Sequence, residues 1–206
     1  MDRYFTELAT AFVRVRLDQS QGTIDTGLQA GLRLHKFKLN VELLRVRTVL
    51  GMLKSLQPEN LLDLGSGRGT FLWPLLAEFR NLPVTTAEIA LRRSTYLAAV
   101  RKGGVQRLTV VRADVHRWPF APRSFDVVTM LEVLEHLADP LLALREGLRS
   151  ARRAVVVSVP STPDENPEHL HLFGMEQLKN MAAEAGAGRT TFEHVLNHRI
   201  MLAQIR

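Results

Sequence analysis

A short apolar run meets a glycine-rich turn at Leu61-Leu62-Asp63-Leu64-Gly65-Ser66-Gly67-Arg68-Gly69-Thr70-Phe71. The apolar residues predict a buried strand, and the residues at 70–79 that follow predict a helix. The glycines allow a tight turn and leave room for a ligand to touch the main chain. A dinucleotide fingerprint would place its third glycine at position 70, which is Thr70 here. Asp63 would repel a pyrophosphate and attract an ammonium group, so the segment favours a ligand that carries an amino-acid moiety.

Similar apolar runs follow this strand, separated by stretches that suit helices. The predicted strands are 61–64, 84–89, 108–111, 125–131 and 154–159. Asp139 is a natural N-cap for a predicted helix at 140–150, in which Pro140 fits the first turn. Residues 190–196 and 199–205 predict an antiparallel hairpin with its turn at Asn197-His198. Because nearly continuous apolar runs are typical of strands covered on both faces, we predict an α/β fold with a doubly wound, mostly parallel sheet.

The first quarter of the chain differs from the rest in charge. Residues 1–55 hold nine basic and five acidic side chains, within a formal net charge of +6 for all 206 residues. We predict helices at 3–17 and 36–56 and a loop at 19–31. The whole chain, 1–206, is predicted to be one domain, with a helical N-terminal cap at 1–56 and a core at 57–206. The basic excess permits an anionic partner such as RNA without requiring one.

Composition excludes several classes of protein. The chain has no cysteine, which rules out disulfides, thiolate zinc sites and a cysteine nucleophile. Gly (13) and Pro (9) occur at ordinary levels, so fibrous and mainly disordered classes do not fit. No apolar run approaches the roughly 20 residues of a membrane span, and the chain begins with charged residues. We therefore expect a soluble, cytoplasmic protein.

Acidic residues also lie at or just after the ends of the next two predicted strands. Glu88 lies 25 residues after Asp63, and Asp114 stands in Arg112-Ala113-Asp114-Val115. In a parallel sheet these three carboxylates would face one crevice. The order and spacing of these motifs over residues 58–206 resemble the class I S-adenosylmethionine (SAM)-dependent methyltransferases, whose Rossmann-like core has a seven-stranded sheet.

That resemblance implies a role for each matching position. Asp63 and the glycine turn would hold the methionine part of SAM, and Glu88 would accept hydrogen bonds from the ribose hydroxyls. Asp114 would accept from the adenine amino group, with the backbone of Val115 beside it. The end of the fourth strand would pass the methyl group. The predicted cofactor-binding residues are Asp63, Gly65, Ser66, Gly67, Gly69, Glu88, Asp114, Val115 and Leu131.

A second cluster follows the fourth strand, where Glu132, Glu135 and His136 form an E-x-x-E-H arrangement. On a helix, a spacing of three would place both carboxylates on one face. Two carboxylates and an imidazole suit Mg²⁺, Mn²⁺ or Zn²⁺, and His171, in a later loop, would complete the set of ligands. The motif resembles two metal-using branches, the small-RNA 3′-terminal 2′-O-methyltransferases and the ubiquinone-pathway O-methyltransferases. There the metal would lower the pKa of the accepting hydroxyl. Without a metal, His136 would serve alone as base.

Three functional hypotheses remain open at this point. The first is an O-methyltransferase of a small molecule or RNA with Glu132, Glu135 and His136 as catalytic residues. The second is a metal-independent methyltransferase of a small molecule, and the third is a non-catalytic module that binds SAM or RNA. The chain has only two Trp and two Tyr, which leaves few rings for stacking on bases and favours a small-molecule acceptor over RNA.

Overall fold

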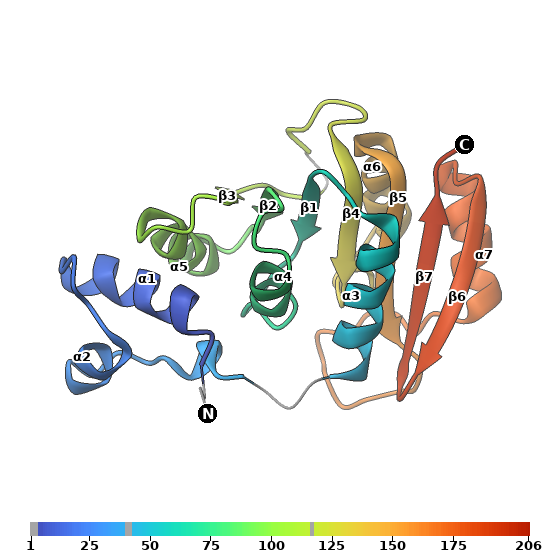
Figure 1. The fold of residues 1–206 in the computed structure, drawn as a ribbon. Helices are drawn as coiled ribbons and strands as arrows, with labels where there is room; N and C mark the ends of the chain where they lie inside the picture. The colour runs from blue at the N-terminus through green and yellow to red at the C-terminus, as the bar shows by residue number, and fades with distance from the viewer. Residues whose placement is uncertain (1–3, 40–42, 116–117) are drawn as a thin grey trace.

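A mixed β-sheet forms the centre of the computed structural model, which describes residues 4–39, 43–115 and 118–206 (Figure 1). Within these residues the sheet has seven strands in the order β3-β2-β1-β4-β5-β7-β6. The strands are β1 (Leu61–Leu64), β2 (Val84–Ala87), β3 (Leu108–Val111), β4 (Phe125–Leu131), β5 (Ala151–Pro160), β6 (Arg189–Val195) and β7 (His198–Gln204). The first five run parallel, and β7 is antiparallel to both β5 and β6. The predicted fold class, with its C-terminal hairpin, is confirmed.

Helices cover both faces of this sheet. The helical segments are α1 (Thr6–Leu17), α2 (Ile24–Gln29), η1 (His35–Phe37), α3 (Leu44–Leu56), α4 (Leu72–Glu78), α5 (Leu91–Lys102), η2 (Leu134–His136), α6 (Pro140–Ser150) and α7 (Met175–Ala185). In β1, Leu61 packs into a core cluster with residues of α1, α3, α4 and α5, and Leu62 packs into a second cluster with α6 and α7. Successive side chains of a strand point to opposite faces, so this short apolar run supplies both cores.

The N-terminal region departs from the prediction in two places. The expected loop at 19–31 contains α2, because the Thr23 hydroxyl accepts from the Thr26 amide at 3.2 Å and the Thr26 hydroxyl accepts from the Thr23 amide at 2.8 Å. This reciprocal cap starts a helix in a polar stretch. The expected helix at 36–56 is shorter, since α3 begins at Leu44 and residues 40–42 lie outside the described range. Before it, Phe37 in η1 is fully buried among aromatic rings.

The bounds of the core strands and helices differ only slightly from the predicted ones. The Asp139 carboxylate accepts from the Leu142 amide at 2.9 Å and caps α6 as expected. Strand β2 ends at Ala87, so Glu88 lies just beyond it, and β5 extends at both ends to Ala151 and Pro160. Among the described residues, no helix is both long and apolar enough to cross a lipid bilayer.

Candidate functional site

The glycine turn after β1 depends on two positions that exclude side chains. Gly65 and Gly69 have φ values of +62° and +86°, in the left-handed region that favours glycine. A Cβ at Gly65 would lie 2.8 Å from the Val133 side chain, and one at Gly69 would lie 2.0 Å from the Trp73 ring. The turn is therefore packed between the segment after β4 and the first turn of α4, which fixes its main-chain amides at the carboxyl edge of the sheet.

Asp63 is the last acidic residue before this turn, and it is almost completely buried. Its carboxylate accepts from the Ser66 hydroxyl at 2.5 Å and from the Thr129 hydroxyl at 2.8 Å. Burial raises the pKa of Asp63 to about 6, although these two hydrogen bonds oppose the rise, and the nearby Glu88 carboxylate adds to it. A cationic group placed beside Asp63 would stabilise its ionised form.

Glu88 is held at the end of β2 by main-chain donors. Its carboxylate accepts from the Gly67 amide at 3.1 Å and from the Ala90 amide at 3.0 Å, and the Arg93 guanidinium lies 4.0 Å away. The side chain is only 3% exposed. Glu88 therefore links the glycine turn to the neighbouring strand, and its position is fixed from both sides.

Two adjoining hollows bring most of the predicted cofactor residues together. A cavity of about 1630 Å³ is lined by Gly65, Glu88, Asp114 and Val115 among others. A smaller hollow of about 150 Å³ is lined by residues that include Asp63, Gly65, Ser66 and Leu131. Gly65 and Glu132 line both. Gly67 and Gly69 line neither and act through the shape of the turn.

Glu132 immediately follows β4 and has a left-handed backbone, with φ +57°. Its carboxylate accepts from the Ser158 hydroxyl at 2.6 Å and from His198 Nε2 at 3.0 Å, and Arg45 Nε lies 3.9 Å away. Burial favours the neutral carboxyl, but these two hydrogen bonds and the charge of Arg45 outweigh it and lower the pKa of Glu132. Glu132 is therefore an ionised carboxylate with its own set of partners.

Glu135 has the opposite environment, although it lies only three residues further on. Its side chain is fully buried, and neither carboxylate oxygen has a hydrogen-bond partner among the described residues. Burial, and then the negative charge of Glu132, raise the pKa of Glu135 to about 8. Its main-chain oxygen accepts from the Leu170 amide at 2.7 Å, which ties the turn to the loop after β5.

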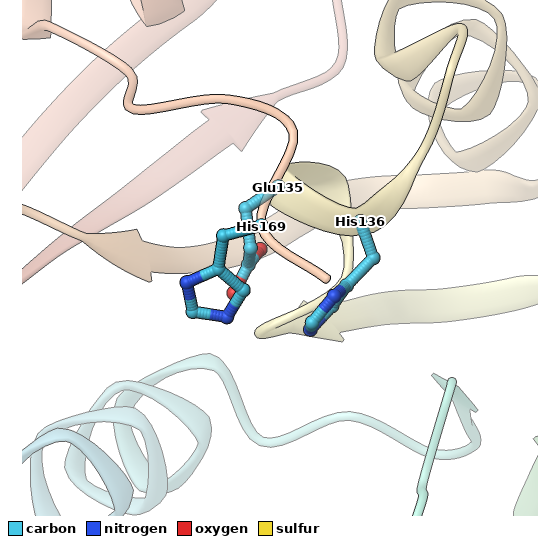
Figure 2. A group of neighbouring side chains, drawn as sticks. All are labelled: Glu135, His136 and His169. Atoms are coloured by element: carbon cyan, nitrogen blue, oxygen red, sulfur yellow. The ribbon is translucent and has the colours of Figure 1, made fainter. Parts of the chain in front are cut away.

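The loop after β5 completes a cluster that the sequence had not assigned. Ligand atoms of Glu135, His136 and His169 lie within 4.8 Å of one another, and Figure 2 shows the three side chains together. His136 Nδ1 donates to the Glu168 carbonyl at 2.9 Å, and His169 Nδ1 lies 2.9 Å from the Asp164 carboxylate. In His136 this hydrogen bond leaves Nε2 as the nitrogen that carries the lone pair of the neutral ring.

The expected ligand set differs from this cluster at two positions. His171 Nε2 donates to the Leu137 carbonyl at 2.9 Å, so His169 stands where His171 was expected. Glu132 binds Ser158 and His198 instead. The prediction that Glu132 and Glu135 share a helical face is wrong, because only the 3₁₀ turn of η2 forms here and it begins after Glu132, at Leu134.

Sequence reasoning also missed the partners of Glu132. His198 was assigned to the hairpin turn, but it is the first residue of β7 and its side chain is only 18% exposed. Ser158 lies on β5 beside the end of β4, in register with Leu131. The hairpin pattern alone could have indicated that the residue after the turn returns to the carboxyl edge of the sheet.

Comparison with known proteins gives independent evidence of similarity to methyltransferases. A family model described as a methyltransferase domain matches residues 62–157. The demethylmenaquinone methyltransferase of Beutenbergia cavernae is 31% identical over 150 residues, which make up 71% of this chain and 60% of that protein. This chain therefore spans about three fifths of the length of that relative.

Solved structures share the fold at low sequence identity. A proposed O-methyltransferase of Nostoc punctiforme aligns with a TM-score of 0.65 at 15% identity, over 78% of this chain and 55% of that one. The magnesium protoporphyrin IX methyltransferase of Synechocystis, solved with bound SAH, aligns with a TM-score of 0.61 at 16% identity, over 79% and 82% of the two chains.

Proposed function

We propose that this chain, as a class I SAM-dependent methyltransferase domain, transfers the methyl group of SAM to a hydroxyl of a small molecule. A divalent metal would assist this transfer. The domain, its fold and its cofactor class agree with the sequence-based prediction. The accepting atom, the acceptor and the metal are our proposals. The name of the curated relative refers to a small molecule, which supports the choice of a small-molecule acceptor.

The convergence of three carboxylates is the observation that carries SAM binding. Asp63, Glu88 and Asp114 follow the carboxyl ends of β1, β2 and β3, which are neighbours in the sheet. Asp63 would pair with the ammonium group of the methionine moiety, and its raised pKa would fall when that charge arrives. Glu88 would accept from the ribose hydroxyls while the Gly67 amide holds it in place. Asp114, with Val115, would bind the adenine.

The residues around Glu135 fit a metal ion. A fully buried carboxylate with two unpartnered oxygens is costly unless a cation or a proton satisfies it. His136 Nδ1 donates to a main-chain oxygen, and His169 Nδ1 lies beside the Asp164 carboxylate. Each ring would then offer Nε2 to a metal, an arrangement typical of metal-binding imidazoles. Two imidazoles and one carboxylate suit Zn²⁺ or Mn²⁺ better than Mg²⁺, which prefers oxygen ligands.

When bound, such a metal would lower the pKa of an acceptor hydroxyl. Glu135, His136 and His169 would hold it at the wall of the large cavity, since His136 lines that cavity. Glu132 lines the same cavity and is held ionised by Ser158 and His198. It would receive or orient the proton of the acceptor hydroxyl. His171 would support the loop rather than act as a ligand.

Two measurements test this proposal. Calorimetry with S-adenosylhomocysteine (SAH) should show binding, and Glu88→Gln should weaken it by about tenfold or more because a charged acceptor is lost. The exposed Glu193→Gln is the matched control and should bind like the wild type. Absence of SAH binding by the wild type would overturn the proposal.

The second measurement concerns the acceptor and the metal. Labelled SAM should transfer its methyl to a cellular fraction of small metabolites rather than to RNA or protein, and EDTA should abolish the transfer. Full activity after exhaustive chelation would contradict a catalytic role for the metal and leave His136 as the base. Transfer to RNA alone would contradict the choice of acceptor.

A further inference from the structure

The large cavity exceeds what one cofactor needs. Its volume of about 1630 Å³ is larger than the roughly 300–1,000 Å³ of most ligand pockets. It extends from Gly65 and Glu88 at the sheet edge to Phe12 and Tyr96. These two residues belong to α1 and α5, helices that pack against each other (Figure 1). The cavity therefore has room for a second molecule beside SAM, beneath the N-terminal helices.

Basic side chains from several elements line this cavity. Six basic residues line it and form no ion pair with any residue that the structure describes: Arg16, Arg33, Lys36, Arg68, Arg92 and Lys102. They come from α1, from the segment before α3, from the glycine turn and from α5. Arg93, on α5 as well, lies 4.0 Å from Glu88. Parts of the chain that are far apart in sequence thus supply cations to one space.

The acidic residues that line the cavity follow strands of the sheet. Glu88 and Asp114 follow β2 and β3, Glu132 follows β4, and Glu168 belongs to the loop after β5. These positions lie along the carboxyl edge of the sheet, where SAM and the metal are proposed to bind. Of the cations that line the cavity, Arg93 lies 4.0 Å from Glu88. The six basic residues named above form no ion pair with these carboxylates among the described residues.

Lys36 shows how closely the cations are placed. Its Nζ lies 4.1 Å from the centre of the Tyr96 ring, on the cavity wall. Burial, and then the positive charges of Arg92, Arg68 and Arg93, lower the pKa of Lys36. Like charges held together at a concave surface attract and orient anions.

SAM itself does not account for this charge, because it carries one carboxylate and no phosphate. We propose that the cations around Lys36 and Arg92 on the cavity wall bind an anionic group, a phosphate or a carboxylate, of the small molecule that accepts the methyl. This proposal rests on the proposed methyltransferase function and specifies its substrate class. The anionic group would anchor one end of the acceptor under α1 and α5, and the hydroxyl of the acceptor would reach Glu132 and His136.

RNA fits this wall of the cavity less well. The Tyr96 ring on this wall offers little surface to a base, because Lys36 covers it and Phe37 stacks against it, with ring centres 5.4 Å apart. Sequence-selective binding of single-stranded RNA relies on exposed rings. The charge around Lys36 is thus the main feature that the site offers to a ligand, which suits a compact anion.

Calorimetry with three matched probes tests the proposal in the presence of saturating SAH. Phenyl phosphate and benzoate each carry a charged group on a phenyl ring. Phenol has the same ring without the charge. We expect both anions to bind and phenol not to bind. The double variant Lys36→Gln/Arg92→Gln should weaken the binding of the anions by about tenfold or more, because two charged contacts are lost. SAH affinity should stay within about twofold of the wild type, which also shows that the variant is folded.

The matched control removes two exposed cations elsewhere, Lys179→Gln/Arg189→Gln on α7 and β6, and should leave anion binding unchanged. Equal affinity for phenol and phenyl phosphate, or an unaffected double variant, would overturn the proposal. Tighter binding of a single-stranded oligoribonucleotide than of phenyl phosphate, lost in the double variant, would replace the small anion with RNA. SAH binding without anion binding refutes only this inference. Anion binding without SAH binding refutes the methyltransferase function and, with it, the assignment of the anion to a methyl acceptor.

Discussion

His198 Nε2 donates to Glu132 Oε2 at 3.0 Å, so the first residue of β7 holds the carboxylate that follows β4. The other ring nitrogen, Nδ1, donates to the Leu196 carbonyl at 2.9 Å. Two acceptors around one ring favour the doubly protonated imidazolium. The hydrogen bond to Glu132 is the largest cause of the raised pKa of His198, and burial opposes it. The C-terminal hairpin thus contributes to the electrostatics of the cavity wall.

Removal of this imidazolium should affect turnover more than cofactor binding. In His198→Ala, Glu132 loses a hydrogen bond and a nearby positive charge, so its pKa should rise. We expect kcat to fall by about tenfold and the acidic limb of the kcat–pH profile to move to higher pH, with SAH affinity unchanged. His194→Ala, at an exposed position on β6, is the control. A pH profile identical to that of the wild type would show that Glu132 does not depend on His198.

Glu135 predicts a pH-dependent stability of the metal-free chain. Its pKa is about 8 when folded, against an ordinary value of 4.5, so the folded chain holds this proton more tightly than the unfolded chain. The stabilisation is fully present below pH 4.5 and is lost as the pH rises through about 8. The difference in pKa corresponds to at most about 5 kcal/mol.

Urea unfolding between pH 5 and pH 9, at roughly one-unit steps, measures this effect. The free energy of unfolding should decline by a few kcal/mol in the wild type and much less in Glu135→Gln, which stays neutral throughout. Glu165→Gln, at an exposed position, should decline like the wild type. A wild-type stability that is flat over this range would contradict the buried, unpartnered carboxyl.

The cluster at Glu135 also predicts which histidine binds a metal. Titration with Zn²⁺ or Mn²⁺ should raise the melting temperature, most strongly near pH 8, because the metal replaces the proton on Glu135. His169→Ala should weaken metal binding by about tenfold or more, and His171→Ala should not, since His171 binds the Leu137 carbonyl. The reverse order of effects would favour the ligand set expected from the sequence.

The strands of the sheet could be predicted well because each one is indicated by the composition of a short, continuous stretch of sequence. The apolar runs of β1, β3 and β4 have the bounds that their composition indicates, and Asp139 caps α6 as expected. The carboxylates at the ends of β1 to β3 were placed correctly at one edge, because parallel strands bring their carboxyl ends together.

Contacts between distant segments could not be predicted in the same way. His169 replaces His171 beside Glu135 because the Leu170 amide bonds to the Glu135 carbonyl, and this loop path is not encoded in the spacing of the histidines. Similarly, His198 reaches Glu132 only because β7 pairs with β5. In both cases tertiary pairing, rather than local pattern, selects the residue.

The packing of the glycine turn gives a final prediction for stability. Gly69 has φ +86°, and a Cβ there would lie 2.0 Å from Trp73, whose Nε1 donates to the Arg68 carbonyl at 3.1 Å. Gly69→Ala must therefore displace a buried ring as well as strain the backbone. We expect a loss of about 2–4 kcal/mol in urea unfolding and weaker SAH binding. Gly51→Ala is the control, because Gly51 lies within α3 with no atom within 4 Å of its added Cβ, and it should stabilise the chain by about 0.5–1 kcal/mol. Equal stabilities of the two variants would mean that Trp73 does not pack against the turn as described.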